Sequence, residues 1–367
     1  MSASDLEVLQ SSIAEVLVAE CGRRDVHAFV DGKNKLDETL WRTAASLGWL
    51  GVGFSEEFGG LGLAADGLDI LHTEIGRNAA PGPFIATLCA AQWIAEVAPQ
   101  QLRATYLERV AAGDLKIAVP ALLNGRPHDL ALDGGRATGE TPLLLGSATS
   151  SLVIIPVWNA NGAAWALIEP DGERAQLLAQ PMWDRTRELC TLRCKGAPVA
   201  ALIDDADGRM LRVLQRHLSL ALASDSIGGA EAILEQTVEY MKTRVQFGKP
   251  IGSFQALKHR VADMTVRLAT DRNLLAQAVE SAASPSGDMW AALAKASITD
   301  GFRLTAADCL QLHGGIGFTW DYDCHLFLKR ARLNEMLVGA NGAQRDFAAS
   351  ELAAITLAGG TSAELAA

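Results

Sequence analysis

Two segments in the last third of the chain combine glycines with cationic and amide side chains. The first runs from Thr243 to Gln255 and the second from Gln311 to Phe318. Arg244 follows a helix-like pattern and precedes the turn at Gly248-Lys249-Pro250, where its guanidinium could hold a pyrophosphate through two parallel hydrogen bonds. In the second segment, Gly314-Gly315 would let backbone N–H groups approach such a ligand closely. Both segments therefore contain groups that could contact an anionic ligand.

Each of these residues also has an ordinary structural explanation. An arginine at a helix end is usually a solvated charge, and phenylalanines such as Phe247 and Phe254 are more often core residues than ligand contacts. Gly314-Gly315 could simply end a helix. Considered one at a time, the residues favour the structural explanation, so a ligand site depends on their occurring together.

A third segment near the N-terminus makes the pattern specific. It comprises Leu47–Val52 and Glu56–Leu63, followed by Glu74–Arg77. With the three segments in this order and spacing, the sequence resembles the acyl-CoA dehydrogenase family, flavoenzymes that oxidise the α,β bond of an acyl-CoA thioester with FAD as hydride acceptor. One glycine-rich loop alone would match by chance. The resemblance covers residues 5–115 and 205–355 well and the middle of the chain poorly.

The resemblance implies which residues would contact FAD. In the family, the arginine at the place of Arg244 reaches across to the FAD of a neighbouring subunit, and Gln255 matches a second FAD-contacting position. The segment Gln311–Gly315 matches a third. The candidate cofactor-binding residues are therefore Arg244, Phe247, Gln255, Gln311, Leu312, His313, Gly314 and Gly315. Their joint occurrence at the family's spacing favours cofactor contact over the structural explanation.

The catalytic base of the family is missing. In the family's reaction a carboxylate removes the α-proton of the thioester while the β-hydride passes to the flavin. Val338 occupies the usual position of that glutamate, and Leu218 occupies the earlier position that some members use instead. Glu335, one helical turn before Val338, could be proposed as a substitute, but a surface glutamate on an amphipathic helix is the simpler interpretation. The sequence therefore predicts no catalytic residue in this chain.

The middle of the chain departs from the family as well. Members carry a threonine-glutamate-proline run and a tryptophan-containing strand against the flavin ring, where this chain has Ala118–Leu123 and Gly139–Leu145. We therefore expect that the chain has lost the groups that would hold a flavin ring of its own. Asp184–Arg187 survives from the family pattern, and we interpret its charges as those of an exposed loop.

The composition limits the class of protein. A hydrophobic content of 49% and a mean hydropathy of +0.14 over 367 residues indicate a well-buried, oligomeric globular protein. The net charge of -11 argues against nucleic acid or an anionic membrane as partner, so polyanionic CoA would need a locally basic site. No apolar run approaches the ~20 residues that span a bilayer, and Met1–Leu6 resembles a helix cap rather than a signal peptide. The six cysteines lack paired metal spacing, so we expect free thiols, no metal site and a cytoplasmic location.

Hydrophobic periodicity divides the chain into three structured regions. Apolar residues such as Leu40, Ala44 and Leu47 recur at helical spacing at the start, whereas the middle has short β-rich runs such as Leu152–Val157, Trp165–Ile168 and Cys190–Arg193. Long helical periods then return. The predicted fold is α+β, with an all-α domain over residues 1–115, a small β domain over 116–206, a four-helix-bundle domain over 207–356 and a flexible tail over 357–367.

These features predict a subunit of a heteromeric α2β2 acyl-CoA dehydrogenase. A homologous partner would supply the glutamate and the flavin-ring pocket, and this chain would supply FAD contacts across the interface. Steroid side-chain CoA thioesters are the substrate class by analogy, and an electron-transferring flavoprotein is the acceptor that the family implies. Two alternatives remain open: a self-sufficient homotetrameric dehydrogenase with an unrecognised base, and a non-catalytic binding or scaffold protein.

Overall fold

The helical, β and helical regions of the sequence appear in that order in the computed structural model, which describes residues 3–123, 130–159, 162–320 and 322–357. The first region folds into helices joined by short connections. These helices are α1 (Ala3–Glu20), α2 (Arg23–Val30), α3 (Leu36–Ser46), α4 (Ala64–Arg77), α5 (Phe84–Val97) and α6 (Gln100–Ala111), with single turns at Trp49–Gly51 and Glu56–Phe58.

Helix α5 forms the centre of this region. Its residues from Phe84 to Ile94 are all buried, which is typical of a helix surrounded by other elements on every side. Trp93 is fully buried, packs against Trp165 with ring centroids 5.3 Å apart, and donates a hydrogen bond to the Met210 carbonyl at 2.9 Å. One tryptophan thereby joins the first helical region to the β region and to the start of the second helical region.

The middle region is a sheet of mostly antiparallel strands. In the described part of the chain the strand order is β2-β3-β8-β4-β1-β5-β6-β9, with β7 beside β8. Among these described strands only β1 and β5 pair in parallel. The predicted strands at Leu152–Val157, Trp165–Ile168 and Cys190–Arg193 are confirmed within β5, β6 and β8. The strands are β1 (Ile117–Pro120), β2 (Ala131–Asp133), β3 (Arg136–Glu140), β4 (Leu144–Leu145), β5 (Leu152–Asn159), β6 (Gly162–Ile168), β7 (Ala175–Gln180), β8 (Leu189–Pro198) and β9 (Ala201–Asp204).

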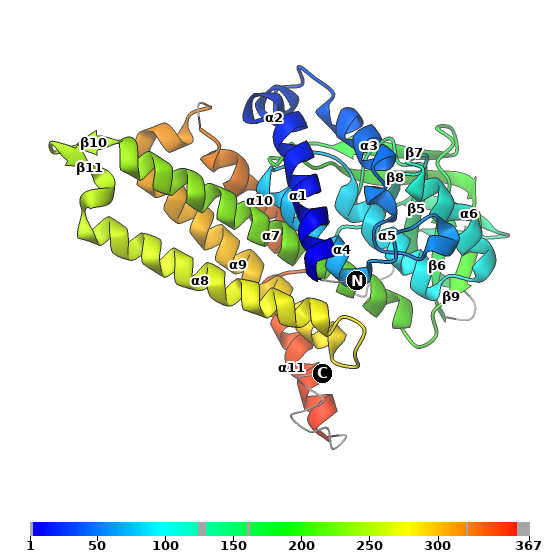
Figure 1. The fold of residues 1–367 in the computed structure, drawn as a ribbon. Coiled ribbons are helices and arrows are strands. Elements are labelled where there is room, and N and C mark those ends of the chain that lie inside the picture. The colour runs from blue at the N-terminus through cyan, green and yellow to red at the C-terminus, as the bar shows by residue number, and fades with distance from the viewer. Residues whose placement is uncertain (1–2, 124–129, 160–161, 321, 358–367) are drawn as a thin grey trace.

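The last region is a bundle of long helices that extends away from the sheet. Figure 1 shows α7, α8 and α9 lying side by side, with a small β10–β11 hairpin at their far tip and α11 projecting from the bundle. The helices are α7 (Arg209–Thr243), α8 (Gln255–Glu280), α9 (Gly287–His313), α10 (Cys324–Met336) and α11 (Asn341–Leu357). The predicted α+β architecture of helical, β and helical-bundle regions is confirmed.

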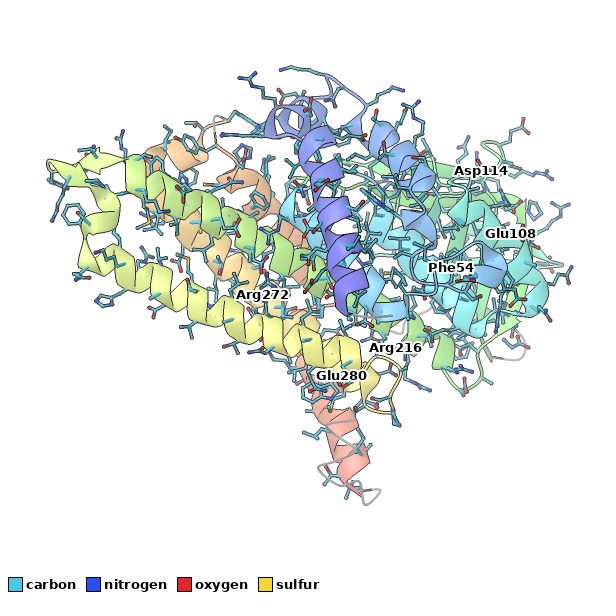
Figure 2. All side chains as sticks on the ribbon, viewed as in Figure 1. Phe54, Glu108, Asp114, Arg216, Arg272 and Glu280 are labelled. Carbon is cyan, nitrogen blue, oxygen red and sulfur yellow. The ribbon has the colours of Figure 1, made fainter. Side chains whose placement is uncertain are left out.

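Ion pairs tie the bundle helices to one another and to the first region. Figure 2 labels Arg272 on α8, whose guanidinium pairs with Glu231 of α7, and Arg216 near the opposite end of α7. Arg216 donates to Glu96 of α5 and to Asp288 of α9, both at 2.7 Å. Because one guanidinium bridges two carboxylates from different helices, it fixes the start of α7 against both.

The interpretation of Asp184–Arg187 as exposed loop charge is wrong for Asp184 and Arg187, which are buried, whereas Arg185 is exposed. Arg187 is 6% exposed, and its guanidinium lies 2.7 Å from Oδ1 of the fully buried Asp225 of α7. Arg330 of α10 pairs with the same carboxylate at 2.5 Å and donates to the Thr186 hydroxyl at 2.9 Å. Burial alone would raise the pKa of Asp225, but the two guanidinium groups outweigh it and hold that pKa well below its usual value. These charges are therefore a buried junction between the β region and the bundle.

Three further expectations concern membranes, thiols and metals. No helix in the described residues is long and apolar enough to cross a membrane. All six cysteines are free and buried. Within the same described ranges, no group of three or more His, Cys, Asp or Glu side chains is arranged to hold a metal ion.

Candidate functional site

The first motif forms the tip of the bundle. Arg244 is the residue at which α7 ends, and the chain then forms a hairpin of β10 (Val245–Gln246) and β11 (Lys249–Pro250). The Arg244 N–H donates to the Tyr240 carbonyl at 2.9 Å, and its own carbonyl accepts from the Ile251 N–H at 2.8 Å. These two bonds fix the arginine backbone at the junction of the helix and the hairpin.

Phe247 and Gly248 form the hairpin turn, with φ values of 52° and 77°. Two consecutive positive φ values are the geometry of a type I′ turn, which suits the twist of a two-residue hairpin. For a bulky residue such as Phe247 this conformation is unfavourable. Its side chain is 92% exposed and meets the ring of Phe254 edge-on, with centroids 6.1 Å apart, so burial does little to compensate for the strain.

The second motif ends α9 and lies opposite the hairpin. Gly314 has φ 63° and ψ -146°, a conformation that only glycine adopts readily. A methyl group built at Gly314 or at Gly315 would meet no atom within 4 Å. Among the described residues nothing fills the space beside the two glycines, which is therefore open to a ligand.

The two motifs line one open groove with a volume of about 610 Å³. All of the predicted cofactor-binding residues except Gln255 line it, namely Arg244, Phe247, Gln311, Leu312, His313, Gly314 and Gly315. Gln255 is exposed at the first position of α8, next to Phe254, which does line the groove. The structure thus brings together residues from α7, the hairpin and α9 that are distant in the sequence.

Three polar residues that line the groove, Tyr240, Gln246 and Arg260, were not among the predicted cofactor-binding residues. Tyr240 lies one helical turn before Arg244 on α7, so helical spacing from the arginine could have found it. Arg260 of α8 has no such signal in the sequence, and its guanidinium is already paired with Asp308 at 2.7 Å. Arg244 is exposed and makes no ion pair with any described residue, so it is the cation available to an anionic ligand.

The two positions expected for a base are filled with buried aliphatic side chains. Val338 is 1% exposed and Leu218 is fully buried, and both belong to a single hydrophobic core that spans the three regions. The Val338 N–H donates to the carbonyl of Ala121 at 2.8 Å, and the Val338 carbonyl accepts from Gln344 at 3.1 Å. Neither position has a proton-accepting side chain.

Glu335 is held in ion pairs rather than being free. Its carboxylate lies 3.4 Å from guanidinium nitrogens of both Arg303 and Arg332. Its backbone carbonyl accepts a hydrogen bond at 2.9 Å from the buried ammonium of Lys295, which also donates to the Gly339 carbonyl at 2.7 Å. Both ion pairs use the same carboxylate oxygen, Oε2, so two arginines hold the Glu335 side chain in place.

Comparison with known proteins identifies the family. Sequence profiles described as the N-terminal and C-terminal domains of acyl-CoA dehydrogenase match residues 4–114 and 216–353, which is more than half of the chain. The chain belongs to the acyl-CoA dehydrogenase family. Residues 115–215 lie outside both matched segments, and they include most of the sheet in which the sequence departs from the family pattern.

One relative and one solved structure are similar to the chain over most of its length. It is 32% identical over 344 residues to the acyl-CoA dehydrogenase IpdE2 of Mycobacterium tuberculosis, which covers 90% of this chain and 92% of the relative. The structure titled as the Tcur3481-Tcur3483 steroid acyl-CoA dehydrogenase, a G363A variant, is 27% identical with a TM-score of 0.87 and covers 96% and 99% of the two chains.

Two structures of lower identity share the fold. The ChsE4-ChsE5 complex of Mycobacterium tuberculosis has a TM-score of 0.85 at 23% identity, and the FAD complex of PigA has a TM-score of 0.85 at 21% identity. Each alignment covers 96% of this chain and 98% of the other. The resemblance to a subunit of the heteromeric members is thereby supported at the level of the fold.

Proposed function

We propose that this chain is the base-lacking subunit of a heteromeric acyl-CoA dehydrogenase and binds FAD across an interface with a homologous catalytic subunit. One observation carries the proposal: an open groove with an unpaired arginine and two accessible glycines coexists with base positions that are filled by Val338 and Leu218. The chain has kept a dinucleotide site and has lost proton-transfer chemistry.

The groove has the donors that FAD requires. Arg244 would hold the pyrophosphate by charge-assisted hydrogen bonds, and the backbone N–H groups beside Gly314 and Gly315 would approach it without a side chain intervening. FAD supplies the acceptor for the substrate hydride when it is bound. This chain would then position the cofactor, while the partner holds the flavin ring and the thioester.

The surroundings of the three candidate positions support the proposal that the partner abstracts the proton. A general base must reach the carbon acid in its charged, unpaired form. Val338 and Leu218 cannot accept a proton, and Glu335 is paired with Arg303 and Arg332. A glutamate of the homologous partner is the remaining source of a base.

The hairpin supports an interface at the tip of the bundle. Phe247 is 92% exposed and strained, and Val245 beside it is 53% exposed. Exposed apolar side chains at the rim of a groove are typical of a protein–protein contact. A partner that covers this tip would bury both side chains. It would also close the groove over the FAD whose flavin ring the partner holds.

The substrate class follows from the family and from the named steroid enzyme. We propose an acyl-CoA thioester, with a bulky steroid side chain as the specific candidate, and an electron-transferring flavoprotein as the oxidant of the reduced flavin. Acyl-CoA oxidation in this arrangement takes place at one complete site in each heterodimer.

The test is co-expression with a homologous dehydrogenase encoded by a neighbouring gene. We expect the chain alone to be colourless, and the co-expressed pair to be a yellow α2β2 tetramer with two flavins and dehydrogenase activity. Light scattering and a flavin count measure both properties. A stable, yellow and active species of this chain alone would instead support a homotetramer with an unrecognised base, and a colourless pair would support a scaffold.

A further inference from the structure

Tyr240 contacts both the side chain and the backbone of His313. The two rings are stacked, with centroids 4.4 Å apart and an interplanar angle of 17°. The Tyr240 hydroxyl donates a hydrogen bond at 3.4 Å to the carbonyl of His313, the residue directly before Gly314. One tyrosine of α7 therefore holds the point at which α9 turns into the glycine segment.

Tyr322 packs edge-on against both of these rings. Its centroid lies 5.6 Å from that of Tyr240 and 5.2 Å from that of His313. The guanidinium of Arg23 lies 5.4 Å from the centroid of the Tyr322 ring and pairs with Asp323 at 2.8 Å. The aromatic group is thus connected to α2 in the first helical region.

The imidazole of His313 has a defined orientation and tautomer. Its Nδ1 lies 2.8 Å from the carbonyl of Cys309, which can only accept, so Nδ1 is the donor. Burial lowers the pKa of His313, which favours the neutral ring. Nε2 is then a hydrogen-bond acceptor, and the His313 side chain is part of the groove wall.

The contacts at His313 restrict the conformation of the glycine pair that follows it. Glycine has the largest conformational freedom of any residue, so a Gly-Gly turn must lose that freedom either on folding or on binding its ligand. A turn already held in its binding conformation binds more tightly because less ordering remains to be done. In this chain the restraint at His313 acts directly next to Gly314-Gly315.

We propose that Tyr240 and Tyr322 are positioning residues for the dinucleotide-binding turn at His313–Gly315. They fix the turn so that its backbone faces the groove, and they orient His313 to accept a hydrogen bond from a hydroxyl or amino group of the cofactor rather than to bind phosphate. The proposal rests on the proposed function, because it assumes that the groove receives FAD.

The test measures how fast FAD leaves the assembled complex after dilution. The increase in flavin fluorescence monitors this release. Loss of a stacked aromatic pair predicts that Tyr240→Leu speeds release about three- to tenfold, while Tyr240→Phe, which keeps the stack, stays within about threefold of the natural protein. Trp158→Leu, at an exposed aromatic residue of β5 outside the groove, is the matched control. Light scattering checks that each variant remains assembled.

The outcomes separate this inference from the proposed function. Release that is unchanged in Tyr240→Leu but faster in Arg244→Ala would overturn the positioning role and leave the FAD site intact. Release that is unchanged in both variants would overturn the FAD site itself. If Tyr240→Leu fails to assemble, Tyr322→Leu decides the matter, since faster release supports positioning and unchanged release contradicts it.

Discussion

The backbone N–H of Val338 donates to the carbonyl of Ala121 at 2.8 Å. This bond joins the loop that would carry a catalytic base to the end of the segment expected to lie against a flavin ring. Val338 has φ 68°, which is unfavourable for a β-branched residue, yet its side chain is almost completely buried. Packing therefore outweighs the backbone strain, and a backbone hydrogen bond joins the two segments.

Val338→Glu should destabilise the chain without creating activity. A carboxylate at this position would be buried in an apolar core, and burial raises the pKa of such a group, so its charged form costs several kcal/mol. A folded-state pKa above the unfolded value means that stability is lost as pH rises, so the variant should melt at a lower temperature at pH 8 than at pH 5. Val338→Gln introduces a side chain of the same size as glutamate but without an ionisable group, so this variant should lack the pH dependence. Restored turnover in the glutamate variant would contradict our reading of the site.

Arg244→Ala should release the cofactor. Loss of a charge-assisted contact worth about 1.5–3 kcal/mol predicts a fall in flavin occupancy of an order of magnitude or more. Arg244→Lys should recover part of the occupancy, because an ammonium lacks the planar fork of the guanidinium. Arg42→Ala, at an exposed arginine of α3, serves as control. Flavin absorbance per complex is the measurement, and unchanged occupancy in Arg244→Ala would make this residue a helix-end charge only.

Helical and strand periodicity indicated the three regions because it depends on local signals. Only the resemblance to a family implied that Arg244 and Gly314-Gly315 belong to one site, since they are distant in the sequence. The burial of Arg187 was not predictable, because its partners Asp225 and Arg330 are distant in the sequence and a charge is buried only where the fold supplies a counter-charge. The stack of Tyr240 on His313 likewise exists only once α7 and α9 are packed.

Glu335→Gln should leave turnover of the complex within a few-fold of the natural value. Removal of a true general base costs about 10²–10⁴ in rate, whereas Glu335 makes half-exposed ion pairs with Arg303 and Arg332 that contribute about 1 kcal/mol or less. Turnover of the assembled, flavin-loaded complex is the measurement. A loss of a hundredfold or more, with flavin and assembly intact, would make Glu335 the base and this chain a catalytic subunit.

Acid should destabilise the fold through His72. This histidine of α4 is 2% exposed, its Nε2 has no hydrogen-bond partner in the described structure, and burial lowers its pKa from 6.5 to about 4. The unfolded chain then binds a proton that the folded chain does not, so stability falls as pH decreases from 6.5 towards 4. At about 1.4 kcal/mol per pKa unit, the loss is on the order of 3 kcal/mol. Denaturation midpoints across this range should have a smaller pH slope in His72→Gln and an unchanged slope in His259→Gln, a variant at an exposed position of α8. An equal slope in all three proteins would show that His72 does not titrate on unfolding.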